Sequence, residues 1–445
     1  MGKVYLSYVK SPFAWMLNFI LTGKPVCRSV PSIILLQEKP LIFASQSFLR
    51  DDRMTNISLQ RIRRKFNSGL NRLSARRQIQ RSLGLPREVQ LVPTNACNLR
   101  CRACPKTYYQ TDNRHLHPDV YEKVKRELFP FIRILNMQGL GEPMLSPLFD
   151  QMVNDAGKLG IKIQFVTNAT KFNSDIMHKL VKYGADVTIS LDGAQKDTHE
   201  YARPGSSFST IMEVFQEFLE LRKNITQTDF RLCINTVVTR RNMEELEPIL
   251  DIAARFQVTF LNLISPGVGE RDDEFAREAI GHYPNLLSAE LKRLIPKARE
   301  ACVGLSYPNL GGQPESGEQK PPMEPIPQEK SKPGRLFPGT CLDPWRLTYI
   351  DVDGWVRPCC RAIWIGMGNI MERPFRKIWN DTHYRKLRAV VNSNNPPDFC
   401  RSCTLVWGIT YGDEFYMKTL EKRGIKLPPP PRIGVIDPRL REAAT

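Results

Sequence analysis

Short apolar runs rich in β-branched residues alternate with amphipathic stretches from Glu88 to about Ser265. Runs bounded by turn residues predict strands, and apolar positions that recur every three or four residues predict helices. Six strands are expected, at Val89–Val92, Ile132–Met137, Ile161–Thr167, Val187–Leu191, Phe230–Val238 and Thr259–Ile264. Five helices are expected between them, at Val120–Leu128, Leu148–Leu159, Ser174–Tyr183, Thr210–Leu221 and Met243–Phe256. Each strand except the last leads into a helix, which predicts an α/β fold whose parallel sheet forms a partial (β/α)6 barrel.

A different pattern precedes this region. Between Ile57 and Leu83 the chain is rich in arginine, and apolar residues recur at helical spacing at Ile62, Phe66, Leu70 and Leu73. This spacing predicts an amphipathic helix with a basic outer face. Two roles are open for it: packing on the following domain with its charges in water, or attachment to an anionic membrane surface through residues 57–83.

Composition shifts mark the other boundaries. Residues 1–85 are expected to be a basic N-terminal extension, and residues 86–310 the partial barrel. Residues 311–339 contain seven prolines and almost no large apolar side chain, which predicts a linker. Residues 340–412 form a compact cysteine-rich unit, and residues 413–445, with four successive prolines at 428–431, form an extended tail.

Charge is distributed unevenly along the chain. The 445 residues are 41% hydrophobic and 25% charged, as in a folded globular protein, and no apolar run reaches the roughly 18–20 residues that cross a bilayer. The net charge is +18, and residues 1–85 hold 15 Lys and Arg but three Asp and Glu. This segment, rather than the whole chain, is expected to meet an anionic partner. Without a convincing export signal, we expect a cytoplasmic protein, or one held peripherally at the membrane surface.

The cysteines fall into two groups. One group lies on a single loop directly after the first strand, at Cys97, Cys101 and Cys104. Three thiolates can hold three corners of a four-iron cluster, which normally takes four protein sulfurs, so one iron keeps an open position. A zinc site completed by a fourth ligand such as Cys233, or plain buried thiols, is the alternative.

Polar groups follow the next strands at the same edge of the sheet. The second strand ends in Gly139-Leu140-Gly141-Glu142-Pro143, where glycines allow close backbone approach and the carboxylate can accept from an ammonium group. Thr167 and Asn168 end the third strand and Ser190 the fourth, and such short side chains can bond ribose hydroxyls.

Together these residues resemble the radical S-adenosylmethionine (SAM) superfamily, from about Val89 to Cys403. The resemblance implies a [4Fe–4S] cluster on the three-cysteine loop, whose open iron chelates SAM. It also implies SAM contacts outside that loop: the methionine amino group at Gly139, Gly141, Glu142 and Pro143, the ribose at Ser190, and the carboxylate at Arg203. Two positions depart from the family pattern, since Leu140 replaces a glycine and Ala103 replaces a frequent aromatic residue next to adenine.

The second cysteine group supplies four sulfurs, from Cys341, Cys359, Cys400 and Cys403. Asp353-Gly354 predicts a tight turn that brings the first two together across a hairpin. The spacing allows zinc or a closed four-iron cluster. The arrangement resembles the short twitch form of the SPASM domain, which implies one auxiliary [4Fe–4S] cluster. Cys360 is a candidate hydrogen-atom donor, with an inert buried thiol as the alternative.

The resemblance implies that SAM is cleaved reductively to a 5′-deoxyadenosyl radical, which abstracts hydrogen from a substrate. We expect oxidation or epimerisation of a small sugar-like or other biosynthetic metabolite, with flavodoxin or ferredoxin as electron donor. The alternatives are modification of a ribosomally synthesised peptide, a lipid-linked substrate at the membrane surface, and a non-catalytic zinc and nucleic-acid-binding protein. Nucleic acid is disfavoured because the basic residues lack interleaved aromatic residues and no nucleic-acid module is present.

Overall fold

A computed structural model describes most of the chain between residues 52 and 403. The described residues are 52–108, 112–225, 228–266, 273–307, 341–393, 395–401 and 403, and side chains are described from Leu59 onward, except at 398 and 401. The predictions for residues 1–51, for the linker at 311–339 and for the tail at 413–445 lie outside these residues.

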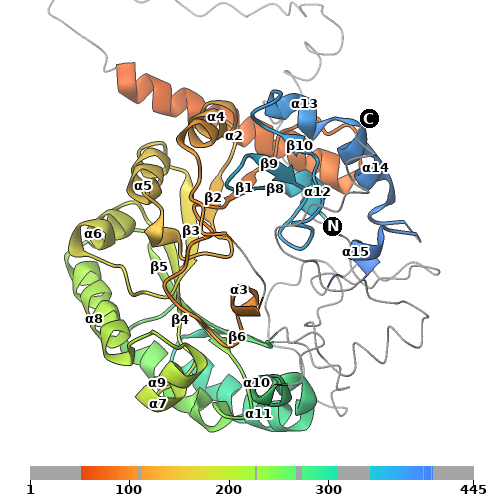
Figure 1. The fold of residues 1–445 in the computed structure, drawn as a ribbon. Helices are drawn as coiled ribbons and strands as arrows, with labels where there is room; N and C mark the ends of the chain where they lie inside the picture. The colour runs from red at the N-terminus through yellow and green to blue at the C-terminus, as the bar shows by residue number, and fades with distance from the viewer. Residues whose placement is uncertain are drawn as a thin grey trace, which may run out of the picture. The chain divides into compact units, whose positions relative to one another are not determined.

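One sheet of ten strands organises the described residues (Figure 1), in the order β10-β9-β8-β1-β2-β3-β4-β5-β6-β7. The strand pairs from β8 through β1 to β7 are parallel, whereas β8–β9 and β9–β10 are antiparallel. The strands are β1 Glu88–Leu91, β2 Ile134–Met137, β3 Lys162–Thr167, β4 Asp186–Ser190, β5 Arg231–Val237, β6 Phe260–Ile264, β7 Gly304–Ser306, β8 Leu347–Ile350, β9 Trp355–Arg357 and β10 Gly368–Asn369.

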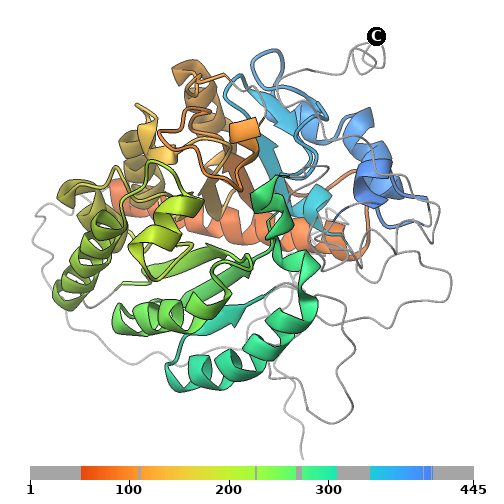
Figure 2. The same cartoon turned by 60° about the horizontal axis from the view of Figure 1, so that its bottom comes forward.

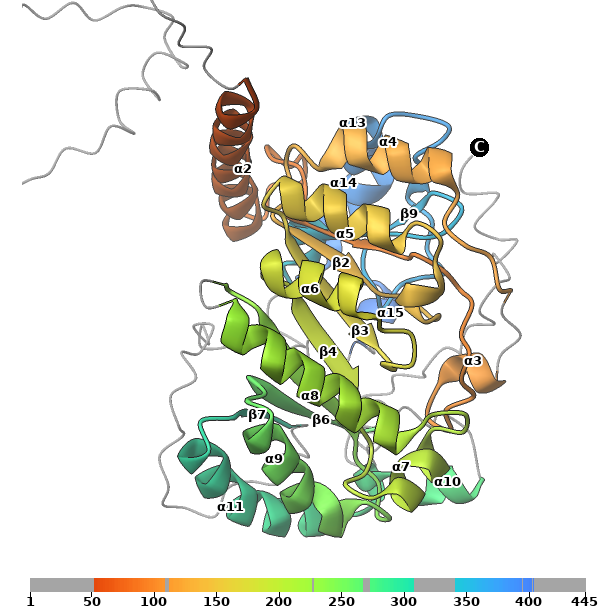
Figure 3. The ribbon, with the colours of Figure 1, turned by 90° about the vertical axis from the view of Figure 1, so that its left-hand side faces the viewer.

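The six predicted strands form as β1 to β6, in parallel order, and the five predicted helices form between them. These helices are α4 Pro118–Leu128, α5 Phe149–Lys158, α6 Ser174–Lys182, α8 Phe208–Asn224 and α9 Leu246–Arg255. Local capping fixes two of their starts, because the Asn173 side chain accepts from the amide of Ile176 and the Ser207 hydroxyl accepts from that of Thr210. Figure 3 shows α5, α6 and α8 covering one face of the sheet.

The barrel extends beyond the six predicted units on both sides. A helix, α11 (Pro284–Glu300), follows β6 and leads into β7, a seventh parallel strand. On the other side β8, from the cysteine-rich region, pairs in parallel with β1 in the register Glu88 to Leu347. The carboxy-terminal elements therefore continue the same sheet. Shorter helices complete the described part: α3 Pro105–Tyr108, α7 Lys196–Ala202, α10 Glu274–Arg277, α12 Asp343–Arg346, α13 Phe375–Trp379, α14 Thr382–Val390, α15 Asp398–Arg401, η1 Pro143–Leu145, η2 Met243–Glu245 and η3 Ile280–His282.

The two faces of the barrel strands differ in polarity. Along β5, Leu232 and Ile234 are fully buried in the core beneath the helices. The alternating residues Cys233 and Asn235 are only partly buried, on the inner face of the sheet. Successive strand residues point to opposite faces, so the core lies between sheet and helices and the interior carries polar side chains.

The predicted basic helix forms as α2 (Asp52–Arg76), and most of its basic side chains are exposed as expected, but its apolar positions are not the side that packs on the domain. Its buried side chains are polar or small and include Arg64, Asn67, Ser68, Asn71 and Ser74, whereas the apolar positions Ile62, Phe66 and Leu73 are exposed. The reason is hydrogen bonding. Arg64 donates to the carbonyls of Phe129 and Leu159, and Asn67 and Asn71 donate to that of Leu85. These carbonyls precede β1, β2 and β3, so α2 packs across the amino-terminal edge of the sheet.

The carboxy-terminal elements are packed against this part of the molecule. Trp379 donates to the carbonyl of Gly84, and the buried Arg388 donates to the carbonyls of Pro344 and Gln80. Figures 1 and 2 show the blue helices beside one end of α2, where α12 contacts it. The described residues thus belong to one compact unit.

Candidate active site at the carboxyl edge of the sheet

The first cysteine group lies on the loop between β1 and α3. Backbone hydrogen bonds hold this loop against the end of α7, from the amide of Arg102 to the carbonyl of Ala202 at 3.0 Å. Burial raises the pKa of the Cys101 thiol to about 11, although the nearby Arg203 guanidinium opposes this rise. The Cys104 and Cys97 thiols are close enough to Cys101 to raise its pKa further. The three predicted thiols are therefore neighbours, as the loop spacing predicts.

The glycine-rich segment after β2 lies directly against the cysteine loop. A Cβ atom on Gly141 would stand 2.5 Å from the carbonyl oxygen of Thr94 and closer still to that of Ala96. Only glycine permits this approach. The amide of Glu142 then donates to the carbonyl of Ala96 at 2.8 Å. Of the neighbouring predicted residues, Gly139 packs against Val92, and Pro143 opens the short helix η1.

Glu142 is buried, with 3% of its surface exposed. Its carboxylate accepts hydrogen bonds from the Thr167 hydroxyl at 2.7 Å, the Asn168 amide at 2.8 Å and the Met144 amide at 3.3 Å. Burial raises the pKa of Glu142, and these hydrogen bonds and the Arg203 charge offset only part of the rise. None of the three donors is a cation, so among the described residues this buried carboxylate has no direct ion pair.

Thr167 and Asn168 have an immediate structural task that the sequence did not indicate. Thr167 holds Glu142, and the Asn168 side-chain amide donates to the Asn98 side chain of the cysteine loop at 3.0 Å. Their contact with a ribose stays a prediction. Ser190 ends β4 on the inner face of the sheet, and its predicted ribose contact is also untested.

Arg203 follows α7 and is directed at two groups of the site. Its Nε lies 2.7 Å from a carboxylate oxygen of Asp192, and its Nη1 donates to the Cys101 sulfur at 3.7 Å. Burial lowers the pKa of Arg203, but the Asp192 carboxylate and the Cys101 thiol raise it more, so the net shift is upward. Sequence reasoning missed Asp192, although it stands two residues after the predicted Ser190. The buried Asp192 also accepts from the amide of Val237 at 2.7 Å.

A row of polar side chains crosses the inner face of the barrel from β4 to β7. The strand register pairs Ser190 with Asn235, Asn235 with Asn262, and Asn262 with Ser306. The amide of Asn262 donates to the side-chain oxygen of Asn235 at 3.0 Å. Sequence reasoning missed this row. The available signal was an Asn at an inner-face position in each of two neighbouring strands, Asn235 in β5 and Asn262 in β6.

The four cysteines of the second group lie next to one another. Burial raises the pKa of the Cys341 thiol to about 12, with Cys403 among the contributing neighbours. Burial also raises the pKa values of Cys359 and Cys400, and the Cys341 thiol adds to both shifts. The predicted turn forms at Gly354, with φ of +84°, and joins β8 to β9. The Asn392 side chain accepts from the backbone amide of Cys341 at 2.8 Å and donates to the backbone carbonyl of Cys341 at 3.0 Å.

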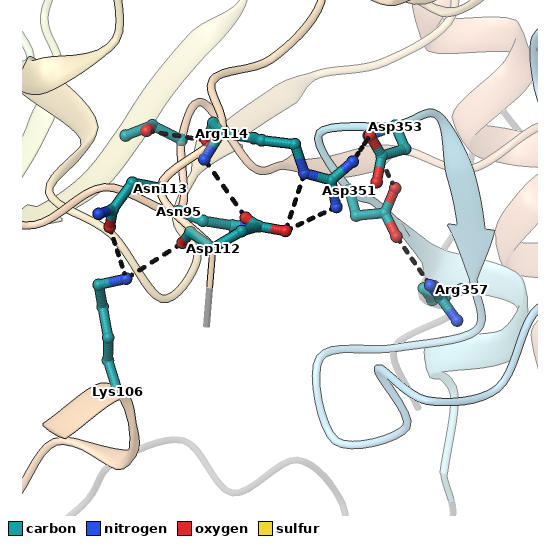
Figure 4. Close-up of polar contacts among 9 residues, drawn as sticks. Asn95, Lys106, Asp112, Asn113, Arg114, Asp351, Asp353 and Arg357 are labelled. Atoms are coloured by element: carbon teal, nitrogen blue, oxygen red, sulfur yellow. Dashed lines mark hydrogen bonds and ion pairs between the residues drawn. The ribbon is translucent and has the colours of Figure 1, made fainter. Parts of the chain in front are cut away.

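An ion-pair network joins the two cysteine regions (Figure 4). Arg114, in the segment after the first cysteine loop, contacts Asp112 at 2.6 Å and Asp353 of the β8–β9 turn at 2.5 Å. The Asn95 side chain also donates to Asp112, at 2.7 Å. The network therefore ties the loop that carries the first three thiols to the hairpin of the second group.

Cys360 lies between the two regions. Together with Ile363 it packs against a small buried cluster formed by Val92, Tyr349 and Val352. Burial raises the pKa of the Cys360 thiol, which is therefore held as the protonated S–H form at neutral pH.

Comparisons with known proteins agree with these two regions. Residues 91–253 match the model of the radical SAM superfamily, and residues 341–404 match that of the SPASM iron–sulfur cluster-binding domain. The chain contains a radical SAM domain followed by a SPASM domain. The radical SAM domain implies a [4Fe–4S] cluster and SAM, and the SPASM domain implies auxiliary iron–sulfur binding.

Curated relatives of this radical SAM enzyme have different named activities. The AdoMet-dependent heme synthase of Methanosarcina barkeri is 26% identical over 68% of this chain and 85% of its own length. The mycofactocin maturase MftC of Mycolicibacterium smegmatis is 30% identical over 41% of this chain, and the match spans 45% of that maturase. The relatives therefore establish the enzyme class and leave the substrate open.

Solved structures share the fold of this radical SAM enzyme. Streptococcus suis SuiB bound to S-adenosylmethionine superposes with a TM-score of 0.53 and 17% identity, over 74% of each chain. AnSMEcpe with bound AdoMet gives a TM-score of 0.53 and 16% identity, over 80% of this chain and 98% of that one. In the part of this chain that is described, no helix is long and apolar enough to span a bilayer.

The thiols fit the iron–sulfur clusters that the two matched domains imply. Among the described residues, no three His, Cys, Asp or Glu side chains lie close enough to hold one metal ion. In a four-iron cluster each thiolate binds a different iron, so the sulfurs stand farther apart than around a single ion. The donor set also fits, because cysteine thiols release their protons and bind iron as thiolates.

Proposed function

We propose that this radical SAM enzyme removes a hydrogen atom from a small polar metabolite and completes an oxidation or an epimerisation. The observation that carries the proposal is the contact between the three-cysteine loop and Glu142, a buried carboxylate with no direct ion pair among the described residues. Cys97, Cys101 and Cys104 would hold the cluster, which would supply the electron for reductive cleavage of SAM.

Glu142 is the residue that selects the orientation of SAM. A buried carboxylate without a cationic partner is costly, and an ammonium group at this point would remove that cost. Thr167 and the amide of Asn168 hold the carboxylate in place, so the amino group of SAM would meet a rigid acceptor. The pKa of Glu142, raised by burial in the free protein, would fall once the ammonium is bound.

Arg203 is a positioning residue in this proposal. It is paired with Asp192 and touches Cys101, so it links β4 to the cysteine loop. Its remaining N–H groups can donate to the carboxylate of SAM, as the resemblance implies. The positive charge beside Cys101 also favours the thiolate form of that ligand.

The interior of the barrel favours a polar substrate. Asn235 and Asn262 present amide donors and acceptors on the inner face, in one row with Ser190 and Ser306. A hydroxylated or amide-bearing metabolite can pair with these groups, whereas an apolar substrate would leave them unsatisfied at a cost of about 1–3 kcal/mol each. This favours a sugar-like or other hydroxylated metabolite over a lipid chain.

Two further roles belong to the proposal. Cys341, Cys359, Cys400 and Cys403 would hold one auxiliary [4Fe–4S] cluster without an open position, which would suit the removal of one electron from a substrate radical. A donor such as flavodoxin or ferredoxin would reduce the cluster at Cys97, Cys101 and Cys104. In an epimerisation, Cys360 would instead give the hydrogen atom of its S–H bond to the substrate radical. The thiyl radical left on Cys360 would return to the thiol by taking up one electron from the donor protein and one proton.

Anaerobic reconstitution tests the class of reaction. We expect about eight irons per chain and reduction-dependent formation of 5′-deoxyadenosine. Replacing Cys97, Cys101 and Cys104 by Ala should abolish this cleavage and leave the auxiliary iron. If only the variants of Cys400 and Cys403 abolish cleavage, the two clusters have been assigned the wrong way round.

A deuterium-transfer assay tests the substrate class. Extract from cells grown in deuterated medium is separated into low-mass polar, peptide and lipid fractions, and each is incubated with enzyme and unlabelled SAM. Deuterium in 5′-deoxyadenosine from the polar fraction supports the proposal. Transfer confined to the peptide or the lipid fraction would replace it with the corresponding alternative substrate.

A further inference from the structure

The outer face of α2 combines an apolar stripe with positive charge. At about 100° per residue, four exposed apolar side chains fall within about 60° of arc on this helix. They form the α2 stripe: Leu59, Ile62, Phe66 and Leu73, with exposed fractions of 66%, 64%, 42% and 45%. The buried polar face of the helix is centred about 150° away. This helix therefore turns its apolar side to the surface.

Basic residues border the stripe on both sides. Arg63 lies on one side, with its guanidinium over the Phe131 ring at 4.1 Å, and Lys65, Arg72 and Arg76 lie exposed on the other. The chain has no Asp or Glu between Arg53 and Arg87. Asp52, the first residue of α2, is the one acidic residue of the helix, and the stripe begins seven residues later.

Figure 3 shows α2 at the edge of the described part, with one side facing no other described element. Its buried side bonds the carbonyls that precede β1, β2 and β3. The stripe thus lies at the amino-terminal edge of the sheet, opposite the cysteines and Glu142.

The positive charge of the border limits which partner can cover the α2 stripe. A second copy of the chain would bring two positive borders together around the same stripe. Residues 1–50 contain six Lys and Arg and one Glu, so that segment is not complementary to the border either. An anionic partner remains, and it has to accept apolar side chains between its charges. The boundary between headgroups and acyl chains of an anionic bilayer has this character.

We propose that the α2 stripe and its basic border bind the surface of an anionic lipid bilayer. The apolar side chains enter the headgroup–acyl boundary, and the Lys and Arg side chains reach the phosphates. Because the stripe and the candidate active site lie at opposite edges of the sheet, α2 would hold the enzyme at the membrane rather than guide a lipid into the barrel. This proposal is independent of the substrate class.

Vesicle co-sedimentation of the reconstituted full-length enzyme tests it. We expect binding to equimolar phosphatidylcholine and phosphatidylglycerol vesicles, weak binding to phosphatidylcholine alone, and loss of binding as salt rises. Ile62→Ser/Phe66→Ser should weaken binding at least about tenfold, and Lys65→Gln/Arg72→Gln should do so by a similar factor.

Control variants carry the same kinds of substitution, apolar to Ser and basic to Gln, at exposed positions of other helices. Leu286→Ser/Val390→Ser removes exposed apolar side chains from α11 and α14, and Lys292→Gln/Lys386→Gln removes two exposed charges. Both controls should bind vesicles as the parent does, and all variants should cleave SAM normally in solution. Absence of anionic-vesicle binding, or equal loss in controls and test variants, overturns the proposal. A dimer in sedimentation that Ile62→Ser/Phe66→Ser dissociates would also overturn it, since the stripe would then be a subunit contact.

Discussion

Gly141 offers a direct test of how the site is built. In Gly141→Ala, the added methyl group would meet three backbone atoms of the cysteine loop, from Thr94, Asn95 and Ala96, at 2.8 Å or less. Ordinary contacts of a Cβ atom lie at about 3.4–4 Å, and backbone cannot rotate away as a side chain can. The loop would therefore have to move by about 1 Å. A displacement of that size at a reacting centre costs about 100-fold in rate.

The expected result is a selective defect. The cysteine loop lies at the sheet edge, so it can shift while the core stays packed, and we expect the Gly141→Ala protein to fold. Reconstituted protein should lose iron from the three-cysteine site and keep the auxiliary cluster, giving about four irons per chain. SAM cleavage should fall by about 100-fold or more.

Gly69→Ala is the matched control. Gly69 lies on the surface of α2, and nothing stands within 4 Å of the position a Cβ would take. Alanine should stabilise this helix by about 0.5–1 kcal/mol and leave iron content unchanged. Iron content and SAM cleavage are measured on both proteins, with urea unfolding to follow stability. Full iron and parental cleavage in Gly141→Ala would refute the close contact between the glycine segment and the cysteine loop.

Three further variants probe the same site. Glu142→Gln keeps the shape and removes the charge, so the Kd for SAM, measured calorimetrically, should rise about tenfold or more; an unchanged Kd would exclude Glu142 as the ammonium acceptor. Because burial raises the pKa of Glu142 above its ordinary 4.5, the folded protein holds that proton more tightly. The free energy of unfolding of the SAM-free parent should therefore fall as pH rises above about 4.5, more steeply than that of Glu142→Gln, and parallel urea-derived profiles would contradict this. Arg203→Gln leaves the buried Asp192 unpaired and should destabilise the protein by about 3–5 kcal/mol. Adding Asp192→Asn to this variant should recover part of the lost stability. If urea unfolding shows no recovery, the two residues act separately. Asn262→Leu should raise the KM of the substrate, once identified, without changing SAM binding, and a changed Kd for SAM would place Asn262 in the cofactor site instead.

The spacing of apolar and polar residues was sufficient to predict the elements that depend on nearby residues alone. The alternation of apolar runs and helical stretches predicted β1 to β6 and the helices between them, because period-two and period-3.6 patterns reflect which side is buried. The three-cysteine loop, the Gly141-Glu142 segment and the turn at Gly354 were predictable for a similar reason. Each depends on a few consecutive residues whose chemistry or conformational freedom is specific.

Only the tertiary structure decided the remaining features, because each depends on partners far away in the chain. The orientation of α2 followed from carbonyls near Phe129, Leu159 and Leu85, which made its polar side the better one to bury. The pairing of β8 with β1 joined segments about 260 residues apart, beyond the reach of any local pattern. The link from Asp192 through Arg203 to Cys101 likewise required three separate loops to meet at the carboxyl edge. The sequence by itself determined which chemical groups this protein carries and roughly where its strands lie, and the long-range packing decided which of those groups face one another and which face the solvent.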